Sequence, residues 1–190
     1  MNAMWQLWNQ RFPKESCESI VTEALKITPR DAVIGFSGSN IDTNVRRSKV
    51  RWIDRSHPQL GWLFHEATNL FHIANHNAFG AELWHLNEMQ FTEYSEDTQG
   101  FYNWHNDVNW DDGRQAHRKL SLVIQLTDPK DYEGGDFEMQ PLHLGPPPAD
   151  QLKQQGAVIV FPSFVVHRVT PVTKGTRHSL VAWIEGPKWR

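Results

Sequence analysis

A chain of 190 residues with 39% hydrophobic and 22% charged side chains has the composition of one folded domain, which excludes an intrinsically disordered protein. The net charge of −3 gives no support for nucleic-acid binding by broad phosphate neutralisation, and the single cysteine excludes an internal disulfide and a cysteine-based zinc site. The first residues show no signal peptide and no apolar run is long enough for a membrane span. We therefore expect a cytoplasmic protein that binds neither membrane nor nucleic acid.

Two helices are predicted in residues 13–79, which we expect to form a helical support. The first follows Pro13, and its apolar residues recur at the spacing of one helical face. They are Cys17, Ile20, Val21, Ala24 and Leu25. The second, over residues 58–79, has a longer apolar stripe. Its members are Leu60, Leu63, Phe64, Ala67, Leu70, Phe71 and Ala74.

Between these helices, residues 35–40 have the composition of a loop and residues 50–53 that of a short strand. The basic run over residues 46–51 is interpreted as a solvated strand edge or loop, not as a binding patch.

From about residue 80 onward the apolar period changes to two. Leu120, Leu122, Ile124 and Leu126 alternate with other residues, which predicts a half-buried strand, and residues 157–161 and 176–184 predict two more. Glycine- and proline-rich turns separate these pieces. The sequence therefore predicts a single domain, residues 1–190. Its fold class is mainly β, with a jelly-roll core over about 80–186 packed against the N-terminal helices.

The triplet His105-Asn106-Asp107 is the first candidate site. In an extended segment, residues i and i+2 point to the same side, so the imidazole and the carboxylate can share one metal ion. Such a triplet is common by chance, and a solvated loop is the simpler interpretation. About 60 residues later, His167 lies in an apolar strand context, where a lone histidine is unusual unless it has a specific role.

Arg177 follows ten residues after His167, and on a strand it faces the same way as Ser179 and Trp183. An arginine that points into a core must find an anion, and its guanidinium suits a carboxylate. Two histidines and one carboxylate are typical of non-haem iron(II) oxygenases. An inward arginine beside them is suited to the far carboxylate of a 2-oxo acid, so the four residues together are far more specific than any one.

Six segments carry a family resemblance. Residues 89–94, 101–107, 132–137, 160–163, 167–171 and 175–180 resemble the prolyl-4-hydroxylase branch of the 2-oxoglutarate and iron(II)-dependent dioxygenases. Collagen-type members have lysine where this chain has Arg177, so the chain looks closer to the arginine-using, oxygen-sensor-like members. Residues 45–52 also resemble the strand that follows the mobile substrate loop of that branch.

The resemblance implies a double-stranded β-helix in which His105, Asp107 and His167 ligate iron(II). It implies that Arg177 binds the distal carboxylate of 2-oxoglutarate, with the Tyr94 hydroxyl as a second donor. Ser179 and Trp183 would line the same pocket. The implied cofactors are Fe(II), 2-oxoglutarate and O2, with ascorbate as a supporting reductant, and the implied reaction hydroxylates an unactivated C–H bond while 2-oxoglutarate becomes succinate.

The resemblance favours a prolyl residue of a peptide or protein as the substrate. A small molecule or free amino acid hydroxylated by the same chemistry is an alternative, and a metal-binding jelly roll without oxygenase activity is another. We expect substrate to enter between residues 35–47 and 109–117. Arg118 either contacts substrate or caps the sheet with a surface charge.

Overall fold

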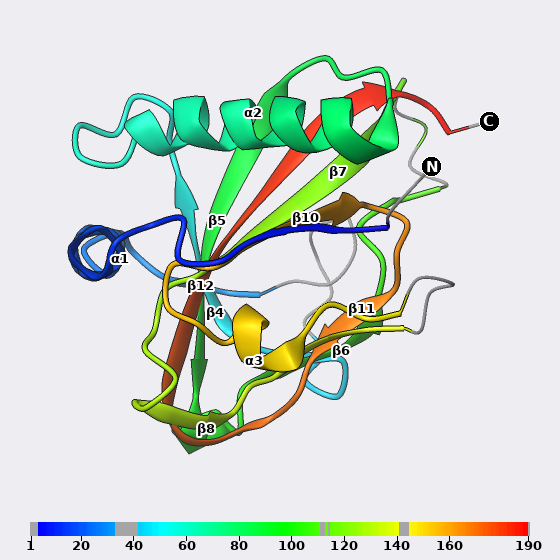
Figure 1. The fold of residues 1–190 in the computed structure, drawn as a ribbon. Helices are drawn as coiled ribbons and strands as arrows, with labels where there is room; N and C mark the ends of the chain where they lie inside the picture. The colour runs from blue at the N-terminus through cyan, green and yellow to red at the C-terminus, as the bar shows by residue number, and fades with distance from the viewer. Residues whose placement is uncertain (1–3, 33–41, 111–112, 114, 141–144, 190) are drawn as a thin grey trace.

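Two antiparallel sheets form the core of the computed structural model, which describes residues 4–32, 42–110, 113, 115–140 and 145–189 (Figure 1). The larger sheet has the order β1-β10-β7-β12-β5-β4-β2, with β8 paired to β12. Its strands are β1 (Gln6–Trp8), β2 (Arg30–Asp31), β4 (Lys49–Ile53), β5 (Leu86–Ser95), β7 (Ala116–Gln125), β8 (Tyr132–Gly134), β10 (Val158–Pro162) and β12 (Val172–Pro187). The smaller sheet, in the order β3-β6-β11-β9, consists of β3 (Arg46–Arg47), β6 (Phe101–His105), β9 (Phe137–Met139) and β11 (His167–Val169).

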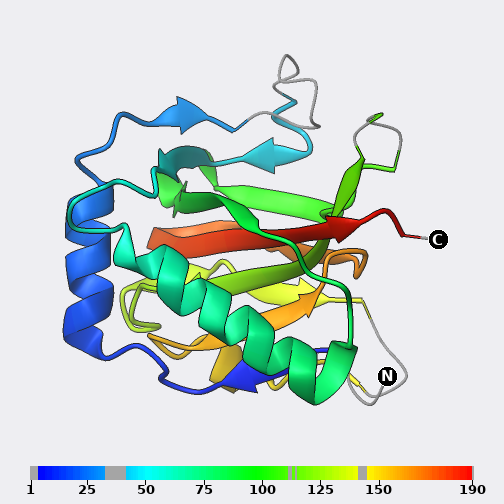
Figure 2. The same cartoon turned by 90° about the horizontal axis from the view of Figure 1, so that it is seen from above.

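Two helices accompany the larger sheet. α1 (Lys14–Ala24) and α2 (Trp62–Ala74) confirm the two predicted helices, and α2 continues into a π-helical turn, η1 (Asn75–Phe79). α2 lies across one face of the larger sheet, as Figure 2 shows from above. Two short helices, η2 (Glu96–Thr98) and α3 (Ala149–Leu152), complete the described elements. Among these described helices, none combines the length and the apolar character needed to span a membrane.

The stripe predicted on α2 packs against this sheet and forms the main core. All seven of its predicted apolar residues are buried, and they meet the β7 residues Leu120, Leu122 and Ile124. Each buried leucine or phenylalanine of the stripe stabilises the fold by about 1.5–3 kcal/mol through removal of apolar surface from water. The expectation of a mainly β fold with helices packed on a jelly roll is confirmed. Leu25 is an exception to the first predicted stripe, since it lies just past the end of α1 and is 43% exposed.

The other face of β7 is buried, although the sequence predicted that it would be exposed. The alternation predicted a half-buried strand, but Lys119, Ser121, Val123 and Gln125 are buried as well. The smaller sheet covers this face, so its polar side chains lie inside the protein and must find polar partners there. The polar face of β7 therefore points into the space between the two sheets.

The basic run is also buried in part. Arg51 is 6% exposed, and it donates to Glu93 at 3.0 Å and to the carbonyl of Ile27 at 3.0 Å. Arg46 is 9% exposed. The prediction of a solvated edge was wrong for these two arginines, because β3 and β4 turn them toward the interior. Of the loop expected over residues 35–47, residues 35–41 lie outside the described part of the structure.

Candidate metal centre and cosubstrate cavity

Two histidines face each other across the smaller sheet. His105 ends β6, His167 begins β11, and the two are directly paired in the antiparallel register. Each imidazole has its Nδ1 close to a backbone carbonyl two residues earlier, at 2.7 Å from Asn103 for His105 and at 3.0 Å from Val165 for His167. A carbonyl can only accept, so Nδ1 carries the proton and Nε2 keeps its lone pair for a metal.

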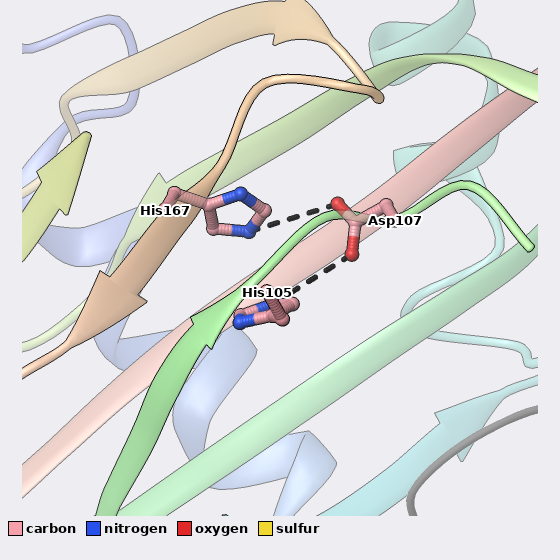
Figure 3. A group of neighbouring side chains, drawn as sticks. All are labelled: His105, Asp107 and His167. Atoms are coloured by element: carbon pink, nitrogen blue, oxygen red, sulfur yellow. Dashed lines mark ion pairs between the residues drawn. The ribbon is translucent and has the colours of Figure 1, made fainter. Parts of the chain in front are cut away.

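Asp107 completes the cluster two residues after His105. Its Oδ1 lies 3.8 Å from Nε2 of His105, and its Oδ2 lies 3.7 Å from Nε2 of His167 (Figure 3). One ligand atom from each residue can be chosen so that all three lie within 4.8 Å of one another. Two imidazoles and one carboxylate are the donor set of non-haem iron(II) sites, so the residues present fit this metal.

Two buried serines contact Asp107, Ser121 at its carboxylate and Ser163 at its backbone. Ser121 on β7 donates to Oδ2 of Asp107 at 2.6 Å, and its Oγ also lies 2.9 Å from Oγ of Ser163. The backbone N–H of Asp107 donates to the carbonyl of Ser163 at 2.8 Å. Both serines are fully buried. Hydrogen bonds of this kind fix the orientation of a ligand and tune its donor strength.

The electrostatics of the cluster favour the protonation state that binds a metal. Burial is the main cause that lowers the pKa of His105 to about 3, and the charge of His167 lowers it further. For Asp107, burial raises the pKa, but the charges of His167, His105 and Arg118 and the hydrogen bond from Ser121 together outweigh it and hold the pKa below its usual value. At neutral pH the site therefore offers a neutral imidazole at His105 and a carboxylate at Asp107.

Aromatic rings wall the cluster. The Tyr102 ring is stacked on His105, with ring centroids 3.4 Å apart, and Phe161 meets His167 edge-on at 4.9 Å. Burial raises the pKa of Tyr102 to about 12, so its hydroxyl stays protonated. These rings fix the imidazole planes and exclude water from one side of the cluster.

Arg177 lies in the same cavity on β12, paired in register with Tyr94 on β5. It is 2% exposed, and its buried Nη1 has no hydrogen-bond partner among the described residues. A buried guanidinium without an acceptor is costly, which indicates that an anion completes the site. Ser179 and Trp183 line the cavity from the same face of β12.

All seven residues selected from the sequence line one cavity that is partly open to solvent. Sequence reasoning missed four further residues that matter here: Ser121, Ser163, Tyr102 and Arg46. Ser121 carried a signal, since it stands on the polar side of an alternating strand, but that side was expected to face solvent. Residues 111, 112 and 114 belong to the second of the two segments expected to border the substrate entrance, and they lie outside the described part of the structure.

Arg118 does not act as an exposed cap. Its side chain is 11% exposed, it pairs with Glu88 at 2.6 Å, and its guanidinium lies 3.8 Å from the ring centroid of Trp183. Of the two alternatives for Arg118, the exposed surface charge was wrong, because its guanidinium lies over the Trp183 indole, which lines the cavity.

The sequence family agrees with this geometry. The model of the 2OG-Fe(II) oxygenase superfamily matches residues 89–185, just over half of the chain. The chain belongs to this superfamily. Its members take their name from 2-oxoglutarate and iron(II), and the two histidines, the carboxylate and the unpaired arginine of this cavity fit those two groups.

Curated relatives match a shorter part. A PKHD-type hydroxylase of Gloeothece citriformis is 42% identical over 70 residues, which are 35% of this chain and 29% of that protein. Another, from Acidovorax ebreus, is 37% identical over 73 residues, or 38% of this chain and 30% of that protein. The chain therefore covers only about a third of the length of these relatives.

Solved structures resemble nearly the whole chain. A prolyl-4-hydroxylase of Pseudomonas putida has a TM-score of 0.72 at 22% identity, covering 97% of this chain and 94% of its own. A prolyl hydroxylase of Trichoplax adhaerens, in complex with a peptide fragment of hypoxia inducible factor, has a TM-score of 0.76 at 14% identity, covering 95% and 83%. At these identities the likeness shows a shared fold.

Proposed function

We propose that the chain is an iron(II)- and 2-oxoglutarate-dependent oxygenase that hydroxylates an unactivated C–H bond, and that a prolyl residue of a peptide or protein is its substrate. The observation that carries the proposal is Arg177, a buried guanidinium whose Nη1 has no hydrogen-bond partner among the described residues. It lines the same cavity as His105, Asp107 and His167. A jelly roll that only bound a metal would have no need of this arginine. The substrate class is supported by the names of two structural neighbours, both prolyl hydroxylases, and by the peptide complex of one of them.

In this proposal the three clustered residues hold the metal and Arg177 holds the distal carboxylate of 2-oxoglutarate. The Tyr94 ring lies 5.7 Å from the Arg177 guanidinium, and its hydroxyl would be a second donor to that carboxylate. When bound, iron(II) supplies the oxidising chemistry, with dioxygen as oxidant and the decarboxylation of 2-oxoglutarate as the electron source. The chain itself contributes fixed ligand geometry, orientation of the cosubstrate and exclusion of water, and no side chain need act as a general acid or base.

Anaerobic titration tests this function. Iron(II) and then 2-oxoglutarate are added to the apoprotein, and the visible charge-transfer band of the chelate is expected. Arg177→Ala should weaken 2-oxoglutarate binding at least about tenfold, as expected for loss of a charged hydrogen-bonding partner, while metal affinity changes little. Arg11→Ala is the matched control, because Arg11 pairs with Glu66 on the outside of α2. Equal loss of both ligands in Arg177→Ala would contradict the assignment.

Substrate class is tested in the same preparation under air. Succinate formation stimulated by a proline-containing peptide, with a mass gain of one oxygen atom on the peptide, is the expected result. Stimulation by small molecules or free amino acids but by no peptide would favour the small-molecule alternative. His167→Ala should lose both metal binding and turnover, and turnover that persists in proportion to added iron would contradict the ligand set.

A further inference from the structure

A second arginine, Arg46 on β3, lines the same cavity as Arg177. Its Nε donates to Oγ of Ser48 at 2.8 Å, and its guanidinium lies 4.5 Å from the ring centroid of Tyr102. Tyr102 in turn is stacked on His105. The positive charge of Arg46 is therefore held over the Tyr102 ring, one aromatic ring away from a residue of the metal cluster.

Arg46 differs from two nearby arginines, Arg51 and Arg118, in its lack of an acidic partner among the described residues. Arg51 is paired with Glu93 at 3.0 Å and Arg118 with Glu88 at 2.6 Å. Within the described part of the chain, Arg46 has no carboxylate within 4.0 Å, although it is only 9% exposed. A cation this well buried is expected to meet an anion in the working state of the protein, because desolvation without a partner is costly.

On the basis of the function proposed above, the cavity with iron(II) and 2-oxoglutarate bound carries one positive charge that no anion among the described residues balances. Asp107 is the only acidic residue among the described residues that line the cavity. Iron(II) with Asp107 leaves one positive charge, and 2-oxoglutarate with Arg177 leaves one negative charge, so these four groups balance one another. Arg46 then adds a positive charge that no described lining residue balances.

We propose that Arg46 binds a carboxylate of the substrate, so that the C–H group to be hydroxylated belongs to an acidic molecule. A guanidinium placed over the Tyr102 ring and hydrogen-bonded to Ser48 is restrained in position, which favours recognition of a carboxylate by its fork of N–H groups. The carboxylate belongs either to an acidic residue beside the oxidised one in a peptide, or to a free amino acid. A purely structural role, in which Arg46 only packs β3 onto Tyr102, predicts a loss of stability but no preference for charged substrates.

Matched pairs of probes test this selectivity. One pair is N-acetyl-Pro-Glu-amide and N-acetyl-Pro-Gln-amide, and the other is free proline and prolinamide. For each probe, kcat/KM is measured from succinate formation, and binding is measured anaerobically from the change it makes in the charge-transfer band of the iron(II)·2-oxoglutarate complex. The wild type is expected to prefer the acidic member of one pair by about tenfold or more, through KM or binding. The pair that responds distinguishes a peptide from a free amino acid.

Three variants accompany the wild type. Arg46→Gln should reduce the preference to less than about twofold without changing the charge-transfer band, and Arg46→Lys, which keeps the charge but loses the fork, should retain part of it. Arg47→Gln is the matched control, since Arg47 is the next residue of β3, lies over Phe101, and does not line this cavity. It should keep the full preference.

Several outcomes would overturn the role of Arg46. They are a wild type that treats both members of each pair alike or binds none of the probes, an Arg46→Gln variant that keeps the preference, and an Arg47→Gln variant that loses it equally. Each of these leaves the charge-transfer band intact and hence leaves the proposed function standing. Absence of the band in the wild type would instead contradict the function itself.

Discussion

Replacing Ser121 by alanine removes the hydrogen bond that holds the carboxylate of Asp107. The bond is 2.6 Å long, fully buried, and made to an ionised acceptor, whose pKa it helps to keep low. Hydrogen bonds to charged groups contribute about 1.5–3 kcal/mol, and the lower half of this range applies if water or Ser163 takes over part of the role. The expected loss of iron(II) affinity is therefore about 10- to 100-fold, the usual size for a group that orients a metal ligand.

The measurement is an anaerobic competition titration of iron(II) against a chelator of known affinity. Ser163→Ala should weaken binding less than Ser121→Ala, because Ser163 reaches the carboxylate only through Ser121. Ser56→Ala is the control, since Ser56 also donates to an aspartate, Asp54, but in an exposed turn. An iron affinity in Ser121→Ala within about twofold of wild type would refute the argument that this contact orients the ligand.

Three further predictions concern the stability of the fold. Removing the metal with a chelator should lower the free energy of unfolding by about 2.7 kcal/mol relative to protein with metal at 100 times its dissociation constant, seen as a fall in Tm. Burial lowers the pKa of His178 to about 4, so below pH 6.5 the unfolded chain binds a proton at this residue before the folded chain does. The free energy of unfolding of the wild type should therefore fall by up to about 1.4 kcal/mol per pH unit between pH 6.5 and about 4. His178→Gln should flatten this pH dependence. Phe71→Ala should cost about 3–5 kcal/mol in urea unfolding, because the ring is fully buried between α2 and the sheet.

Each of these has a result that would count against it. An unchanged Tm after chelation would mean that the cluster does not bind the metal in the folded state. An equally steep acid dependence in His178→Gln would assign the slope to other groups. A fall of less than about 1 kcal/mol in the free energy of unfolding of Phe71→Ala would mean that α2 can repack into the space left by the missing ring.

Local patterns in the sequence predicted the apolar framework and six of the seven cavity residues, and the family resemblance supplied the seventh, Tyr94. The α2 stripe follows directly from helical spacing, and Arg177 was selected because a charge buried on an apolar strand requires an anionic partner. The local patterns around Ser121 and Arg46 instead indicated exposure to solvent. Serine on an alternating strand and arginine in a basic run are usually solvated, and only the placement of the smaller sheet over β7 and of Tyr102 under Arg46 makes them interior residues.

Register was also beyond local reasoning. The pairing of Tyr94 with Arg177 and of His105 with His167 depends on how strands far apart in the chain align. Hydrophobic period fixes which face a residue takes, but not which residue on another strand lies opposite it.

The direct pairing of the two histidines also bears on where this chain tolerates a change of length. β11 is only three residues long and begins with His167, so one residue inserted within it would shift that imidazole away from His105 or turn it to the other face. The turn between β7 and β8 lies outside that pairing, and added residues there would leave the cluster in place. Length variation among functional homologues should therefore concentrate in such turns and spare β6 and β11, even where the identity of the surrounding residues drifts.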